Sequence, residues 1–278
     1  MTATAALPRL QLTEGDGRIT FKILEGGTAL ERLHQGGAAK VRLPHSHGRR
    51  AMEAVLINTS GGLAGGDRLD WAVEAGPGTQ AVITTQACER AYRSLGDPAR
   101  VSIALRVGEG ARLDWLPQET ILYDGSSLER RLDAEVAPGA TLLVCEAVLL
   151  GRLAHGERVR AARFHDRWRI RRGGRLAFAE DTRLDGAVDA IASRAATLDG
   201  GAAYASILLL TDDPSSLLDP VRDALAGAGD DAVGGASAFD GKLICRMVAQ
   251  DGLRLRRALI PALTVLRGGL GLPRVWTN

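Results

Sequence analysis

Hydrophobic and polar positions alternate along the middle of the chain, in short runs separated by glycine. Four units recur there, each made of one such run, a glycine turn and a second run. The turns contain Gly78, Gly110, Gly139 and Gly174, at spacings of 32, 29 and 35 residues. Runs of this kind joined by glycine turns predict β-hairpins. A near-constant period predicts that antiparallel hairpins stack into a β-helix-like body, with a large sandwich of hairpins as the alternative.

Strand 167–171 shows the alternation most clearly, with arginine at every second position. Because successive side chains of a strand point to opposite faces, Trp168 and Ile170 are expected in the core. The three arginines then face outward, either as a solvated sheet face or as a surface for an acidic partner.

The pattern changes at about residue 187. Residues 187–198 are rich in alanine and compatible with a helix, and 204–210 are apolar as in a strand. Residues 214–226 predict a helix with Pro214 near its start, and 232–249 predict a hairpin across Asp240-Gly241. Residues 252–267 predict an amphipathic helix with Leu253, Leu259, Leu263 and Leu266 on one side and Arg254, Arg256, Arg257 and Arg267 on the other.

We therefore expect a mainly β fold with a few helices packed on the β-helix-like body. A single domain would span residues 1–278. Its β body would cover about 20–186, and an α+β portion of about 187–278 would pack on that body, because no long linker separates the two.

A glycine-rich loop, Asn-Thr-Ser-Gly-Gly-Leu-Ala-Gly-Gly-Asp-Arg, occupies residues 58–68. A phosphate-binding P-loop would need Lys after the glycines, and a dinucleotide fingerprint would need a helix there. Residues 69–73 instead alternate like a strand. The loop is as readily a structural bend between two strands as a binding site.

Composition narrows the functional classes. The 278 residues carry a net charge of +2, which gives no general case for nucleic acid, and only 4% are aromatic. Cys88, Cys145 and Cys245 are far apart and form no CxxC pair, as expected for reduced thiols in a cytoplasmic protein. The first residues lack a signal-peptide pattern, and no apolar run is long enough to span a bilayer. We expect a cytoplasmic protein with no membrane or nucleic-acid partner.

Catalytic motifs are missing: the sequence contains neither Gly-x-Ser-x-Gly nor His-Glu-x-x-His. His45 and His47, with His34 upstream, are the nearest approach to a transition-metal cluster, but they lie in what resembles an exposed turn. Carboxylates in or beside apolar β segments are more informative, because a buried carboxylate must be paired, protonated or bound to a cation. Glu146 is the clearest interior acid, with an arginine partner as the alternative to a cation.

Several segments in fixed order resemble the urease accessory protein family UreD, called UreH in some organisms. They are residues 58–67, 84–94 (Thr-Thr-Gln-Ala-Cys-Glu-Arg-Ala-Tyr-Arg-Ser), 115–124 (Trp-Leu-Pro-Gln-Glu-Thr-Ile-Leu-Tyr-Asp), Glu146, 150–157 (Leu-Gly-Arg-Leu-Ala-His-Gly-Glu), 166–170 and 273–276. The resemblance implies a non-enzymatic maturation chaperone with a β-helix-like fold. Such proteins bind apo-urease (UreABC) and recruit UreF, which engages the GTPase UreG, so that nickel reaches the urease metal site. Tunnels proposed for the family would carry the nickel.

A conduit for Ni²⁺ needs oxygen ligands that hold the ion without trapping it. We therefore predict that the lining of a transient nickel path, with no tightly bound cofactor, includes Asp67, Glu119, Asp124, Glu146 and Glu180. Asp67 and Glu119 lie inside the family-like segments, whereas Glu180 is chosen only for its position and charge. His45 and His47 match no such segment. A β-fold hydrolase, or a ligand-binding module of unknown substrate, is the alternative function.

Overall fold

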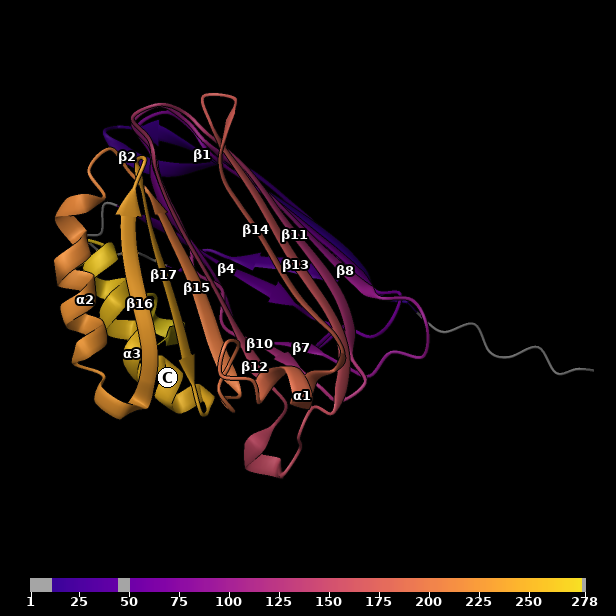
Figure 1. Cartoon of the computed structure of the whole chain (residues 1–278). Coiled ribbons are helices and arrows are strands. Elements are labelled where there is room, and N and C mark those ends of the chain that lie inside the picture. The colour runs from indigo at the N-terminus through magenta and orange to yellow at the C-terminus, as the bar shows by residue number, and fades with distance from the viewer. Residues whose placement is uncertain (1–11, 45–50, 277–278) are drawn as a thin grey trace, which may run out of the picture.

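The computed structural model describes residues 12–44 and 51–276, which form two facing β-sheets and a small helical layer (Figure 1). His45 and His47 lie outside the described residues. The seven-stranded sheet has the order β14 (Arg175–Ala187), β13 (Ala161–Arg172), β11 (Ser127–Val136), β8 (Ala99–Val107), β5 (Arg68–Ala75), β1 (Glu14–Leu24) and β2 (Gly27–Gly37).

The second sheet contains ten of the described strands. Its main path is β16 (Ala232–Phe239), β17 (Lys242–Ala249), β15 (Ala203–Leu210), β12 (Thr141–Leu150), β9 (Arg112–Trp115), β6 (Gln80–Thr85), β4 (Met52–Asn58) and β3 (Ala39–Arg42). Two short strands complete it, since β10 (Thr120–Leu122) pairs with both β12 and β7 (Glu89–Ala91).

The β-helix-like stack is confirmed, but the pairing expected within its first three units is wrong. The turns at Gly78, Gly110 and Gly139 carry the chain from the seven-stranded sheet to the ten-stranded sheet. Each strand then pairs in parallel with its counterpart in the next unit, as β5 with β8 and β6 with β9. A strand that buries one face has the same alternation in either arrangement, so the pattern could not separate them. The turns at 173–174 and 240–241 do close antiparallel hairpins.

Stacked apolar side chains fill the space between the sheets. Trp71, Ile103, Leu132 and Trp168 are in register across four neighbouring strands, and each is at most 6% exposed. Ile170 is also buried, which confirms the inward face predicted for strand 167–171. Parallel stacking of like residues gives one continuous core along the body.

Helices α2 (Leu218–Ala226) and α3 (Gly252–Leu266) cover the outer face of the ten-stranded sheet at β15–β17 (Figure 1). Leu259, Leu263 and Leu266 are buried as predicted, but Leu253 is 64% exposed because it lies in the first turn of α3. The 3₁₀ turns are η1 (Leu153–His155), η2 (Ser215–Leu217), η3 (Gly229–Asp231) and η4 (Arg274–Trp276).

Two features of the C-terminal portion differ from the sequence prediction. The alanine-rich segment forms only the five-residue α1 (Val188–Ala192), not a helix to residue 198. Arg267 is 5% exposed and binds Asp114, so the arginines of the last helix do not all face solvent. None of the described helices has the length and apolar character needed to cross a bilayer.

Candidate functional site

The five predicted carboxylates occupy separate positions, and each already has a polar partner. Within 12–44 and 51–276, no three His, Cys, Asp or Glu residues are grouped as ligands for a metal ion. Four of the five carboxylates are buried, namely Asp67, Glu119, Glu146 and Glu180. The fifth, Asp124, lies at the surface.

Asp67 closes the glycine-rich loop. Its Oδ1 accepts a hydrogen bond of 2.7 Å from the Thr13 backbone N–H, and its Oδ2 accepts one of 2.7 Å from that of Ala64. Gly62 has a φ of +151°, and a Cβ there would lie 2.4 Å from the Tyr92 ring. Glycine is therefore required for the close approach of the loop to Tyr92. The loop joins β4 to β5, as the sequence predicted.

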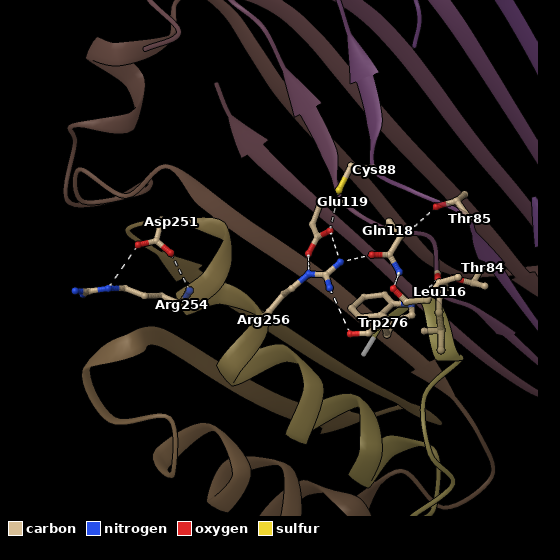
Figure 2. A network of polar contacts seen from close by, with 11 residues as sticks. Thr84, Thr85, Cys88, Leu116, Gln118, Glu119, Asp251, Arg254, Arg256 and Trp276 are labelled. Carbon is tan, nitrogen blue, oxygen red and sulfur yellow. Dashed lines mark hydrogen bonds and ion pairs between the residues drawn. The ribbon is translucent and has the colours of Figure 1, made fainter. Parts of the chain in front are cut away.

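Glu119 anchors the last helix to the β body (Figure 2). Its carboxylate accepts hydrogen bonds of 2.6 and 2.9 Å from the Arg256 guanidinium, which also donates to Gln118. Burial alone would raise the pKa of Glu119, but the hydrogen bonds and charge of Arg256 outweigh burial and lower it. Burial and the charge of Glu119 raise the pKa of the nearby Cys88 thiol to about 12, so this thiol is not an activated nucleophile.

The C-terminal residues complete this contact. Trp276 is 1% exposed and donates from Nε1 to the Leu116 carbonyl at 3.1 Å. Gln118 donates to the Val275 carbonyl at 3.2 Å. The segment 116–119 therefore holds both α3 and the η4 turn, and we call this set of contacts the C-terminal clamp (Figure 2).

Glu146 belongs to a buried triad with Arg130 and Asp166. The Arg130 guanidinium lies 2.5 Å from Glu146 Oε2 and 2.6 Å from Asp166 Oδ2. Trp115 Nε1 donates to the other Glu146 oxygen at 2.9 Å. Burial raises the pKa of Glu146 to about 7; the charge of Arg130 opposes this rise and the charge of Asp166 adds to it. One guanidinium shared by two carboxylates leaves a net negative charge, which protonation of Glu146 removes.

Glu180 and Asp124 are held in different ways. Glu180 accepts hydrogen bonds from Ser206 at 2.7 Å and from Arg246 at 3.0 Å. Asp124 accepts from the Arg160 and Ala161 backbone N–H groups at 2.8 and 3.1 Å, and from the Arg160 side chain. The hydrogen bond from Ala161 is the main reason why the pKa of Asp124 is lowered.

A small internal cavity of about 50 Å³ lies between the sheets beside the triad. It is large enough for water, and its polar lining residues are Thr85, Glu89, Gln118, Thr120, Arg130 and Glu146. Sequence reasoning missed Glu89, whose pKa burial raises to about 7 and whose carboxylate accepts hydrogen bonds of 3.1 and 3.2 Å from Asn58. Its position in segment 84–94 was the only signal available.

The oxygens of the predicted acids are therefore already bound by arginine side chains or by backbone N–H groups. Ni²⁺ could bind Glu119, Glu146 or Glu180 through the oxygens described only by displacing an arginine, and Asp67 only by displacing two backbone N–H groups. His34 lies at the surface with its Nε2 2.6 Å from Asp16 Oδ2.

Known proteins of similar sequence match nearly the whole chain. The family model described as UreD urease accessory protein matches residues 13–277. The urease accessory protein UreD of Rhizobium leguminosarum bv. viciae is 49% identical over 276 residues, covering 99% of both chains. The UreD protein of Chelativorans sp. (strain BNC1) is 53% identical over 268 residues, covering 96% of this chain and 95% of its own length.

Proposed function

Because the chain belongs to the UreD family of urease accessory proteins, we propose that it is a non-catalytic chaperone of urease maturation. In this role it binds apo-urease and recruits UreF, which engages the GTPase UreG for nickel insertion. The observation that carries the proposal is the match over almost the full length of chain and relatives alike.

The fold supports a scaffold role. Helices α2 and α3 cover one side of the molecule, and no described helix covers the outer face of the seven-stranded sheet (Figure 1). That face presents charged side chains of both signs in neighbouring strands, such as Asp70, Arg106, Glu135 and Arg171. A broad, rigid and charged surface suits specific association with other proteins.

We further propose that Ni²⁺ crosses the interior as cargo between the two sheets. The support is the small cavity between the sheets, whose lining includes Glu89 and Glu146, and the nearby Asp166 that shares Arg130 with Glu146. Carboxylates bind nickel less tightly than thiolates or imidazoles do, which favours release. Passage requires Arg130 to move away from Glu146 while the ion is present.

Co-expression tests the scaffold role. The chain should co-purify with UreF and with apo-urease, and UreG should join when UreF is present. Size-exclusion chromatography of the mixed proteins gives the composition of each complex. A chain that binds neither UreF nor apo-urease would contradict this function.

Nickel loading of urease tests the interior path. Glu146→Gln and Asp67→Asn keep the shape of each side chain but remove a carboxylate that could bind Ni²⁺. We therefore expect less nickel per urease active site, while the complexes with the partner proteins still form. Glu74→Gln, on the exposed side of β5, is the matched control and should load normally. Normal nickel content with both interior variants would refute the path and leave the scaffold role standing.

A further inference from the structure

A cleft of about 830 Å³ has no part in the function proposed above. It lies where β7, β10 and the end of β12 meet the start of α3, and its lining includes Arg90, Tyr123, Arg152, Leu153, His155 and Leu253. Its volume is in the range of about 300–1,000 Å³ that accommodates ligands or anchoring side chains.

Three of the segments that carry the family resemblance converge on this cleft. Arg90 comes from segment 84–94, Tyr123 from 115–124, and Arg152 from 150–157. The glycine-rich loop does not line the cleft but contacts the segment that carries Arg90, since Tyr92 donates from its hydroxyl to the Gly61 carbonyl at 2.9 Å. These three segments, together with residues 250–253 at the start of α3, build one concave surface.

Tyr123 and Arg152 form a fixed wall of the cleft, and Tyr92, which is not part of the lining, contacts the Tyr123 ring. The Tyr92 and Tyr123 rings meet edge to face, with centroids 5.1 Å apart. The Arg152 guanidinium lies 4.3 Å from the Tyr123 ring centroid. Its Nε–H donates a hydrogen bond of 2.8 Å to Glu157 Oε2, which fixes the position of the guanidinium. Tyrosine and arginine positioned before binding lose little conformational entropy on association and are frequent hot spots.

The rim of the cleft is apolar and positively charged. Leu153 and Leu253 are 39% and 64% exposed, which is costly for side chains that nothing covers. Asp251 is occupied as the cap of α3, where its Oδ1 accepts from the Arg254 N–H at 2.9 Å (Figure 2). The exposed Arg90 side chain forms no ion pair with a carboxylate in the described ranges, and a hydrogen bond with the Tyr92 side chain raises the pKa of its guanidinium, which stays positively charged.

We propose that this cleft binds an acidic, apolar segment of a partner protein. A leucine-like side chain of that segment covers Leu153 and Leu253, and a neighbouring carboxylate faces Arg90. Exposed leucines beside an arginine that has no carboxylate partner among the described residues match such a segment, whereas a free phosphate would leave the leucines uncovered. The inference rests on the proposed function, because it assigns a surface to one of the scaffold's partners.

Photocrosslinking in the assembled complex tests the location. The chain carrying Leu253→p-benzoylphenylalanine is co-expressed with UreF, UreG and the urease subunits, and crosslinked peptides are identified by mass spectrometry. We expect one crosslinked segment in which Asp and Glu outnumber Lys and Arg. The same replacement at Leu176, which is 56% exposed on β14, is the control and should not capture that segment.

Charge reversal tests the chemistry. Arg90→Glu should weaken binding of the captured partner at least tenfold in titrations by biolayer interferometry. Arg175→Glu, at an exposed position beside the Gly173-Gly174 turn of the β13–β14 hairpin and with the same charge change, should bind like the unaltered chain. Both variants must keep the unaltered melting temperature.

The outcomes separate the two proposals. Complexes that form without a crosslink at Leu253, with a crosslink only to basic segments, or with unchanged affinity for Arg90→Glu would overturn the cleft assignment and leave the scaffold function intact. Failure of the unaltered chain to bind UreF, UreG or urease would overturn both.

Discussion

At the scale of single residues, the ratio of guanidinium groups to carboxylates sets the behaviour of the buried acids. Glu119 has Arg256 as its own cation, and its pKa is lowered. Glu146 shares Arg130 with Asp166, and its pKa is raised to about 7. Both side chains are almost fully buried, so burial alone does not explain the difference. A buried charge without a full counter-charge is relieved by protonation.

Glu146→Gln should change how stability depends on pH. A pKa raised from 4.5 to about 7 on folding means that the native state binds the extra proton. The stability that this proton on Glu146 contributes to the folded state is fully present below about pH 4.5, and it is lost as the pH rises to about 7. The unaltered chain should therefore lose roughly 2–3 kcal/mol between pH 5 and pH 8 that Glu146→Gln does not lose.

Urea unfolding at several pH values measures this difference. Glu89→Gln is the companion variant. The pKa of Glu89 is also raised, so this residue should account for a separate part of the fall in stability with pH. Equal pH slopes for Glu146→Gln and the unaltered chain would show that Glu146 is ionised in the folded state throughout this range.

At the scale of elements, polar contacts decide how α3 is placed. Its buried leucines pack on the ten-stranded sheet, but leucine packing alone permits several rotations and shifts of a helix. Arg256 binds Glu119, and Arg267 binds Asp114 at 2.9 Å. Two charged contacts at opposite ends of α3 fix one orientation. The C-terminal clamp then closes over the helix through Trp276.

Trp276→Ala should destabilise the protein by about 3–5 kcal/mol, the usual cost of deleting a buried large aromatic side chain. The substitution removes the packing of the Trp276 side chain and its hydrogen bond to the Leu116 carbonyl. It also removes the contact between the Trp276 ring and the Arg256 guanidinium, which are 5.4 Å apart. Chemical denaturation measures it. Leu270→Ala, at a 49% exposed position nearby, should change stability by less than about 0.5 kcal/mol, and an equal effect of both would argue against the clamp.

The edge strand β16 has little protection against pairing with another molecule. It contains no charged residue or proline and shows no bulge, and Val233 is 82% exposed. Val233→Lys places a charge on this edge and should reduce self-association, measured by light scattering against concentration. Leu95→Lys is the control: it makes the same charge change at an 85% exposed loop position that is not on this edge strand. Equal effects of both would assign the change to charge alone.

At the scale of the whole molecule, stacking of successive units brings distant segments together in a fixed order. Each unit adds one strand to each sheet, so loops from successive units lie beside one another at the ends of the body. The cleft with Arg90, Tyr123 and Arg152 is one product of this stacking, and the interior cavity with Glu89 and Glu146 is another. A rigid stack of this kind can hold partner-binding surfaces at constant separations.

The sequence alone determined the features that depend on short-range patterns. Alternation predicted the strands and the buried side chains of Trp168 and Ile170, glycines marked the turns, and apolar spacing found α3 nearly to its ends. These features follow from local geometry and burial, which neighbouring residues specify. Segments in fixed order also indicated the family, which the comparisons confirm.

Only the tertiary structure decided which strands pair and which charges meet. A glycine turn can close a hairpin or lead to the opposite sheet, and the competing packing of whole layers makes the choice. Likewise, Glu119 and Arg256 are 137 residues apart, so no local pattern links them. Buried charges are neutralised through space rather than along the chain, which is why five acids that resembled free ligands proved to have partners.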